Sequence, residues 1–98
     1  MKDEALLADY REWPWCQYCG KLTPSGCDPH HIFSKGAGRV DCRENLIALC
    51  RQCHGRVHNG EISRLSLLVI VGHHEKMLVE DLEETVRHIR SLPKGYGE

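Results

Sequence analysis

The sequence lacks any apolar segment long enough to cross a membrane, which would need about 20 consecutive apolar residues. Its longest apolar run is LLVIV at 67–71, and the acidic first ten residues contain no apolar signal segment. It also contains no internal repeat and no low-complexity stretch. We therefore expect a cytoplasmic protein that does not associate with membranes.

The chain also lacks an excess of positive charge. Its 13 basic and 14 acidic side chains give a net charge of −1, which argues against a strong, delocalised nucleic-acid binder. The distribution is uneven, because residues 35–74 contain six basic and three acidic side chains. The flanks are acidic, with three basic against five acidic in 1–34 and four against six in 75–98.

The length of 98 residues supports one small domain with a thin hydrophobic core. Six cysteines are a large number for a chain of this length. Four of them form two C-x-x-C pairs, and without a secretory segment this spacing favours a metal site over disulfides. We expect a tetrahedral structural zinc site, the alternatives being redox pairs or buried free thiols. The paired cysteines are Cys16, Cys19, Cys50 and Cys53, while Cys27 and Cys42 have no matching spacing.

The middle of the chain predicts a ββα unit. Residues 15–21 form a tight turn, 30–33 and 46–49 suit two short strands, and 34–44 form a basic loop with two glycines between them. A helix should begin near Cys50–Arg51 and run to His58, since Asn59-Gly60 favours a stop.

The flanking segments predict helices. Residues 3–12 suit a short helix capped by Asp3. Apolar residues at helical spacing predict two more helices, at about 62–74 and 79–91, as a hairpin whose apolar side packs on the core or a partner. The apolar positions are Ile62, Leu65, Leu68 and Val69, then Val79, Leu82, Val86 and Ile89. We expect an α+β protein with a core at 1–60 and a helical tail at 61–98.

Histidines gather in the same ββα unit. His54 and His58 are four residues apart and face one side of the predicted helix, so with His30 they could hold a second metal ion. Three protein ligands with open positions describe a catalytic site. An exposed helix face with two harmless histidines is the alternative. His31, next to His30, should point to the other face unless the strand ends or bends there. The remaining histidines, His73, His74 and His88, lie outside this group.

The ordered set of these residues resembles the HNH nuclease family, also described as ββα-metal or treble-clef nucleases. The resemblance covers residues 16–58 and rests on C-x-x-C at 16–19, HHI at 30–32, NL at 45–46, LCRQCH at 49–54 and His58. It implies a metal-dependent endonuclease acting on DNA.

The resemblance also implies roles for single residues. His31 matches the general base, His30 and His54 match metal ligands, and Asn45 matches the asparagine that orients the loop of the base. His58 matches a ligand of only some branches. By its spacing alone, Asn45 could equally form a simple turn.

The chemistry of phosphodiester hydrolysis agrees with these roles. A neutral histidine can take a proton from water, and a divalent ion such as Mg²⁺, Mn²⁺, Ni²⁺ or Zn²⁺ can stabilise the phosphate and the 3′-oxygen. Basic side chains of the loop and helix could contact flanking phosphates. These are Lys35, Arg39, Arg43, Arg51 and Arg56.

Two rival functions remain at this point. A zinc-binding module could grip nucleic acid or protein without catalysis, because one fold serves many functions. The chain could also be a toxin or homing-type enzyme in a larger assembly. A homodimer or a protein partner could form through the C-terminal helices.

Overall fold

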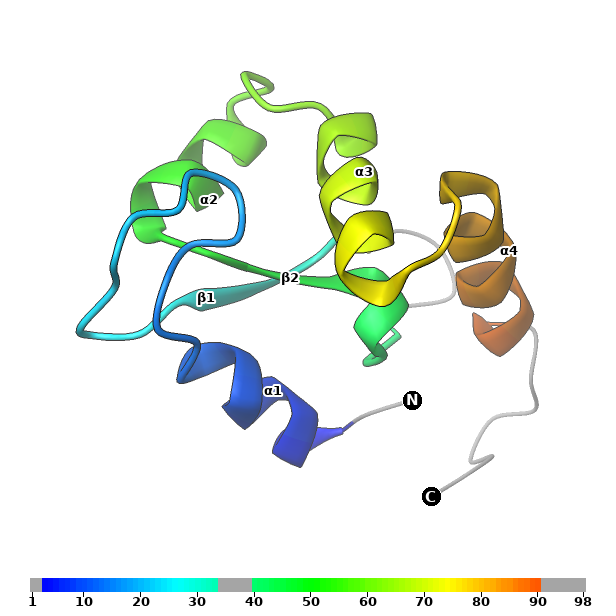
Figure 1. Ribbon diagram of the computed structural model, residues 1–98, viewed down its shortest axis with the longest axis horizontal. Helices are drawn as coiled ribbons and strands as arrows, with labels where there is room; N and C mark the ends of the chain where they lie inside the picture. Colours follow the sequence, from blue (N-terminus) through cyan, green and yellow to red (C-terminus); the bar gives the residue numbers. More distant parts are fainter. Residues whose placement is uncertain (1–2, 34–39, 91–98) are drawn as a thin grey trace.

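The computed structural model describes residues 3–33 and 40–90. Within them the chain is α+β, with four helices and a small antiparallel sheet compatible with a ββα core. Figure 1 shows the two strands across the middle, with α1 on one side and α2 and α3 on the other. The elements are α1 (Glu4–Arg11), β1 (Asp28–His31), the 3₁₀ turn η1 (Arg43–Asn45), β2 (Leu46–Leu49), α2 (Arg51–His58), α3 (Arg64–Glu75) and α4 (Val79–Arg90).

The sheet pairs four residues of β1 with the four of β2, from Asp28 opposite Leu49 to His31 opposite Leu46. The first strand was predicted at 30–33 and lies two residues earlier. The pairing does not continue as a strand beyond His31, because Ile32 N–H meets the carbonyl of Asn45 in the turn η1 and the Asn45 side chain binds Phe33 N–H. Asp28 and Pro29 are poor strand formers, but Pro29 is tolerated in an edge strand because its missing N–H costs little there.

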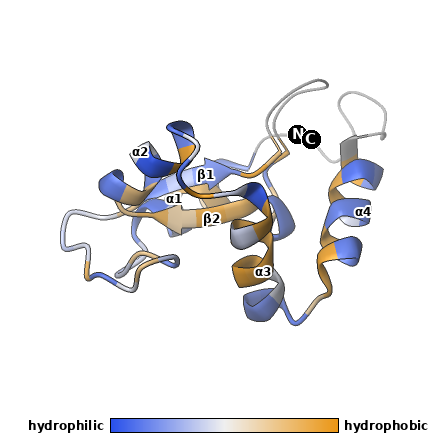
Figure 2. Ribbon diagram, turned by 90° about the horizontal axis from the view of Figure 1, so that it is seen from above, coloured by the Kyte–Doolittle hydropathy of each residue, from blue (hydrophilic) through white to orange (hydrophobic). Residues whose placement is uncertain are grey.

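Strand β2 is buried on both faces and separates two apolar clusters. Leu46 and Ala48 pack with Leu7 and Tyr10 of α1. Ile47 and Leu49 pack on the opposite side, with side chains of α3 and α4. Successive residues of a strand point to opposite faces, so the sequence LIAL serves both clusters. Figure 2 shows β2 and α3 as largely hydrophobic ribbons.

The two C-terminal helices form at nearly the predicted positions, and α3 contacts η1, β2 and α4. The predicted apolar side of α3 was partly wrong. Leu65 and Val69 are 61% and 54% exposed, and the buried side consists of Leu67, Leu68, Val71 and Gly72. Because LLVIV is continuously apolar, spacing alone could not identify the buried side. On α4, Leu82 and Val86 are buried, while Val79 and Ile89 are half-buried.

None of the helices among the described residues is long and apolar enough to span a membrane. The boundary between a core and a tail at residue 60 stays a prediction.

Candidate metal centres and the adjacent histidine

Four cysteine sulfurs converge between the knuckle that follows α1 and the start of α2. The Sγ atoms of Cys16, Cys19, Cys50 and Cys53 all lie within 4.8 Å of one another. Cys19 Sγ and Cys50 Sγ are 3.9 Å apart, close to the roughly 3.8 Å that a tetrahedral site with Zn–S bonds of about 2.3 Å requires. The donor set and its spacing therefore fit a zinc ion.

Local backbone geometry holds these thiols in place. Gly20 adopts a φ of 78°, which lets the knuckle turn so that its N–H donates to the Cys16 carbonyl. Gln17 then ties the knuckle to β2, because its N–H donates to Ala48 O and its Oε1 accepts from Ala48 N–H. The knuckle is thus fixed to the strand that leads into α2.

Backbone N–H groups also point at the sulfurs. Cys19 N–H donates to Cys16 Sγ at 3.5 Å, and Cys53 N–H donates to Cys50 Sγ at 3.4 Å. Burial alone would raise the pKa of the Cys16 thiol, but N–H groups of Cys19, Cys50 and Tyr18 lower its pKa to about 7. Thiolate is the form that binds metal, so this knuckle is prepared for an ion.

A second group consists of three histidines on β1 and α2. One ring nitrogen from each of His30, His54 and His58 lies within 4.8 Å of the others. The Nε2 atoms of His54 and His58 are 3.1 Å apart, near the roughly 3.3 Å expected for two nitrogens on one tetrahedral ion. The sequence-predicted trio is therefore brought together.

The environment of the trio suits metal ligands. Burial, and then the neighbouring imidazoles, lower the pKa of His30 to about 4, so this ring is neutral near pH 7. Asp28 Oδ2 lies 3.2 Å from His54 Nδ1, which directs the other ring nitrogen of His54 toward His58. A carboxylate behind a ligating histidine is the usual means of fixing its tautomer.

His31 has a different environment from its neighbour. It is opposite Leu46 in the sheet, whereas His30 is opposite Ile47. Strand alternation therefore directs His30 toward α2 and His31 toward the side of α1. His31 is outside the metal-ligand group, and its Nε2 lies 2.6 Å from Oδ1 of Asp41. It is also the last residue of β1, at the C-terminal end of the strand where the loop to η1 begins.

Asn45 holds the two ends of the loop between the strands. It is fully buried, and its Oδ1 accepts from Phe33 N–H at 2.8 Å. Its Nδ2 donates to the carbonyls of Phe33 and Val40, at 3.1 and 3.0 Å. The side chain of Asn45 thus makes three hydrogen bonds to the loop, which a residue that only forms a turn would not need.

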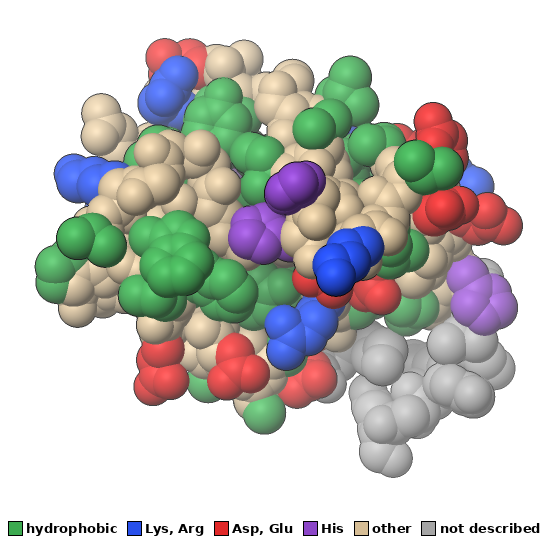
Figure 3. All heavy atoms as spheres, in the orientation of Figure 1, with side chains coloured by type: hydrophobic (Ala, Val, Ile, Leu, Met, Phe, Trp, Pro, Cys, Tyr) green, Lys and Arg blue, Asp and Glu red, His purple; other side chains and the backbone are tan. Residues whose placement is uncertain are grey.

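The basic side chains are spread over several parts of the molecule. Arg51 and Arg56 are exposed on α2, and Arg43 lies beside Tyr10 on the α1 side. Lys35 and Arg39 lie outside the described residues. Figure 3 shows Lys and Arg scattered over the visible face, with acidic side chains near α4 and also along the lower edge and at the top.

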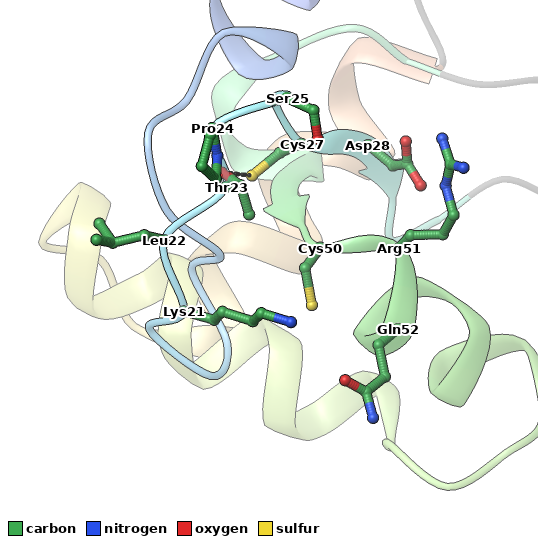
Figure 4. Close-up of a pocket in the computed structure, with 11 residues that line it drawn as sticks. Lys21, Leu22, Thr23, Pro24, Ser25, Cys27, Asp28, Cys50, Arg51 and Gln52 are labelled. Atoms are coloured by element: carbon green, nitrogen blue, oxygen red, sulfur yellow. Dashed lines mark hydrogen bonds between the residues drawn. The ribbon is translucent and has the colours of Figure 1, made fainter.

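A cleft of about 630 Å³ lies between the loop before β1 and the start of α2. Lys21 of the loop and Arg51 and Gln52 of the helix line it, and Figure 4 shows Lys21 extending toward Cys50 and Arg51 lying beside Asp28. Sequence analysis missed Lys21, because nothing in its spacing links it to Arg51. It also missed Asp41, an acidic residue in a stretch taken as a basic loop, and no motif marks it.

The comparisons with known proteins point to one family. Residues 16–60 match the family model described as HNH endonuclease. The search of curated proteins found no match, and neither did the search of solved structures. Both metal-ligand groups fall inside the matched segment. Over residues 16–60, the chain is therefore similar to the HNH endonuclease family.

Proposed function

We propose that the protein is a metal-dependent endonuclease that hydrolyses DNA phosphodiester bonds. The observation that carries this proposal is the trio of His30, His54 and His58 beside His31, a histidine outside the trio that is held by a buried carboxylate. A purely structural zinc module needs the cysteines but has no use for these four histidines.

The two metal-ligand groups have separate tasks. The four cysteines would hold a structural zinc ion, which would fasten the knuckle to α2 in a treble-clef arrangement. The three histidines leave positions open for substrate, and an ion there supplies Lewis-acid stabilisation of the phosphate and of the departing 3′-oxygen. Imidazole donors suit Zn²⁺ and Ni²⁺ better than Mg²⁺, so we expect the former to bind more tightly.

His31 acts as the general base. Its imidazole takes a proton from water, the resulting hydroxide attacks phosphorus, and the bond from phosphorus to the 3′-oxygen breaks. Asn45 binds the backbone of Phe33, two residues after His31, and of Val40, directly before Asp41. It thereby holds both ends of the loop near the base. Arg51 and Lys21 in the cleft, with Arg56, Arg43, Lys35 and Arg39, would contact phosphates on either side of the scissile bond.

The test of this function is cleavage of supercoiled plasmid with Mg²⁺, Mn²⁺, Ni²⁺ or Zn²⁺. Wild-type protein should cut with at least one of them, and His31→Ala should cut about 10²–10⁴-fold more slowly, the range for losing a positioned proton acceptor. The variant should keep its zinc, because His31 is not one of the four clustered cysteine ligands. His73→Ala, on an exposed position of α3, is the matched control and should cut like wild type.

The second candidate function is a zinc-binding module that grips nucleic acid or protein. The mild net charge and the scattered basic side chains favour it. Wild-type protein that binds DNA and cuts it with none of the four metals would establish that function in place of the nuclease.

A further inference from the structure

A buried carboxylate, Asp41, connects His31 to the first turn of α1. Asp41 is only 6% exposed, and its Oδ1 lies 2.6 Å from His31 Nε2. Its other oxygen, Oδ2, accepts a hydrogen bond of 2.8 Å from the backbone N–H of Asp3. Asp3 is the N-cap of α1 and lies outside the segment that matches the HNH family. Each oxygen of the carboxylate therefore has its own partner.

This arrangement decides which ring nitrogen of His31 is free. An ionised carboxylate can only accept hydrogen bonds, so Nε2 must carry the proton that it donates to Asp41. The other nitrogen, Nδ1, then has the lone pair. Among residues 3–33 and 40–90, the hydrogen bond of His31 is made by Nε2, and Nδ1 has no partner there.

We propose that Asp41 is the positioning residue of the general base, and that the N-terminus of α1 holds Asp41 in place. Asp41 fixes the ring of His31 with its proton on Nε2 and its acceptor, Nδ1, directed away from the carboxylate. The helix before the family domain thereby takes part in the active site. This inference rests on the proposed role of His31 as the base.

The hydrogen bond from Asp3 makes the replacement Asp41→Asn unusually informative. The N–H of Asp3 requires an acceptor, so the amide oxygen of the asparagine should turn toward it. The amide NH₂ would then face His31 Nε2 and donate to it, which forces the proton of the ring onto Nδ1. The substitution is nearly isosteric, yet it should exchange the two ring nitrogens and remove the acceptor from the side of the water.

The first measurement is the tautomer of His31 in zinc-loaded protein, from long-range proton–nitrogen NMR with labelled histidine. Loss of the resonance in His31→Ala identifies it. At a pH where the ring is neutral, wild type should have the proton on Nε2 and Asp41→Asn on Nδ1. Wild type with its proton on Nδ1, or with an even mixture, overturns the inference. This measurement needs no catalysis, so the wild-type result shows whether Asp41 sets the tautomer of His31 even if no metal supports cleavage or the variant fails to fold.

The second measurement is the kinetics of cleavage. Asp41→Asn should lower kcat by roughly 10²–10⁴-fold, as expected for a base in the wrong tautomer, and change KM by no more than about twofold. Asp41→Glu, which keeps the charge, should recover part of the loss. The double variant His31→Ala/Asp41→Asn should be no slower than His31→Ala alone, since both act through one group.

The matched control is Asp9→Asn, the same chemical change on an exposed position of α1, which should cleave like wild type. Active wild type with an equally active Asp41→Asn refutes the role of Asp41 and leaves the nuclease in place. Inactive wild type refutes the nuclease, and the NMR result then stands alone as evidence on Asp41.

Discussion

Adjacent residues can have unrelated partners, and His30 and His31 illustrate why. The sequence alone could predict that strand alternation separates them, and that the cysteine and histidine spacings bring ligands together. It could not predict Asp41 as the partner of His31. That contact depends on where the chain from Val40 to Cys42 returns to the sheet, which no local preference determines.

The cysteine group gives the prediction at this scale. Cys50→Ala should lose the zinc and unfold the domain, because structural zinc contributes about 10–16 kcal/mol of apparent binding free energy. This is comparable to the roughly 5–15 kcal/mol by which whole domains are stable. Zinc content by mass spectrometry and thermal unfolding by circular dichroism would measure both effects.

Cys42→Ala is the matched control for that experiment. Cys42 is half-buried, lies outside the metal-ligand group, and burial raises the pKa of its thiol to about 12, so it is protonated at neutral pH. The control should keep one zinc per chain. A Cys50→Ala protein that stays folded with no zinc would refute the structural role of the ion.

At the scale of elements, short sequence features predicted where helices begin and end better than which side of them is buried. Asp3 caps α1 through a bond to Leu6 N–H, and Asn59 ends α2 as expected. The buried side of α3 was mispredicted because neighbouring apolar residues at 67–71 offer several overlapping stripes. The packing of α3 against η1 and α4 selects one of them, and that selection is a tertiary effect.

The turn between α3 and α4 depends on Gly72, where the chain approaches closely. A Cβ atom at this position would lie 2.7 Å from the carbonyl oxygen of Met77, which is backbone and cannot rotate away. Gly72→Ala should therefore destabilise the protein by about 1–3 kcal/mol, the typical cost of overpacking, despite the better helix propensity of alanine. Urea unfolding at equilibrium would measure the change.

Gly55→Ala supplies the comparison for this substitution. Gly55 lies inside α2, and a Cβ there would meet nothing within 4 Å. The helix should gain about 0.5–1 kcal/mol from the replacement. We therefore expect the free energy of unfolding to fall in Gly72→Ala and to rise in Gly55→Ala. An equal effect at both positions would show that helix propensity, and not the approach to Met77, governs Gly72.

At the scale of the whole molecule, the sheet places the candidate metal site and the proposed general base on opposite faces. The face of Ile47 carries His30 of the histidine trio, and the face of Leu46 carries His31 with Asp41 and α1. The mild net charge leaves little general attraction to DNA. A nuclease of this kind would depend on local contacts in the cleft, or on a partner that raises its local concentration.

The C-terminal helices test whether the tail belongs to the fold. Deleting residues 76–98 removes Leu82 and Val86, which are 0% and 2% exposed, and uncovers the side of α3 against which Leu82 packs. The loss of two buried side chains should cost about 3–6 kcal/mol at 1.5–3 kcal/mol each, and the exposed apolar surface should lower solubility. Deleting only 91–98 leaves α4 whole and is the comparison. Urea unfolding and light scattering after size exclusion would compare the three proteins. If full-length protein is a dimer and the longer deletion is a folded monomer, the helices form the contact between copies. The deletion of 76–98 could instead match the full-length protein in stability, solubility and oligomeric state. In that case α4 is a tether and not part of the core.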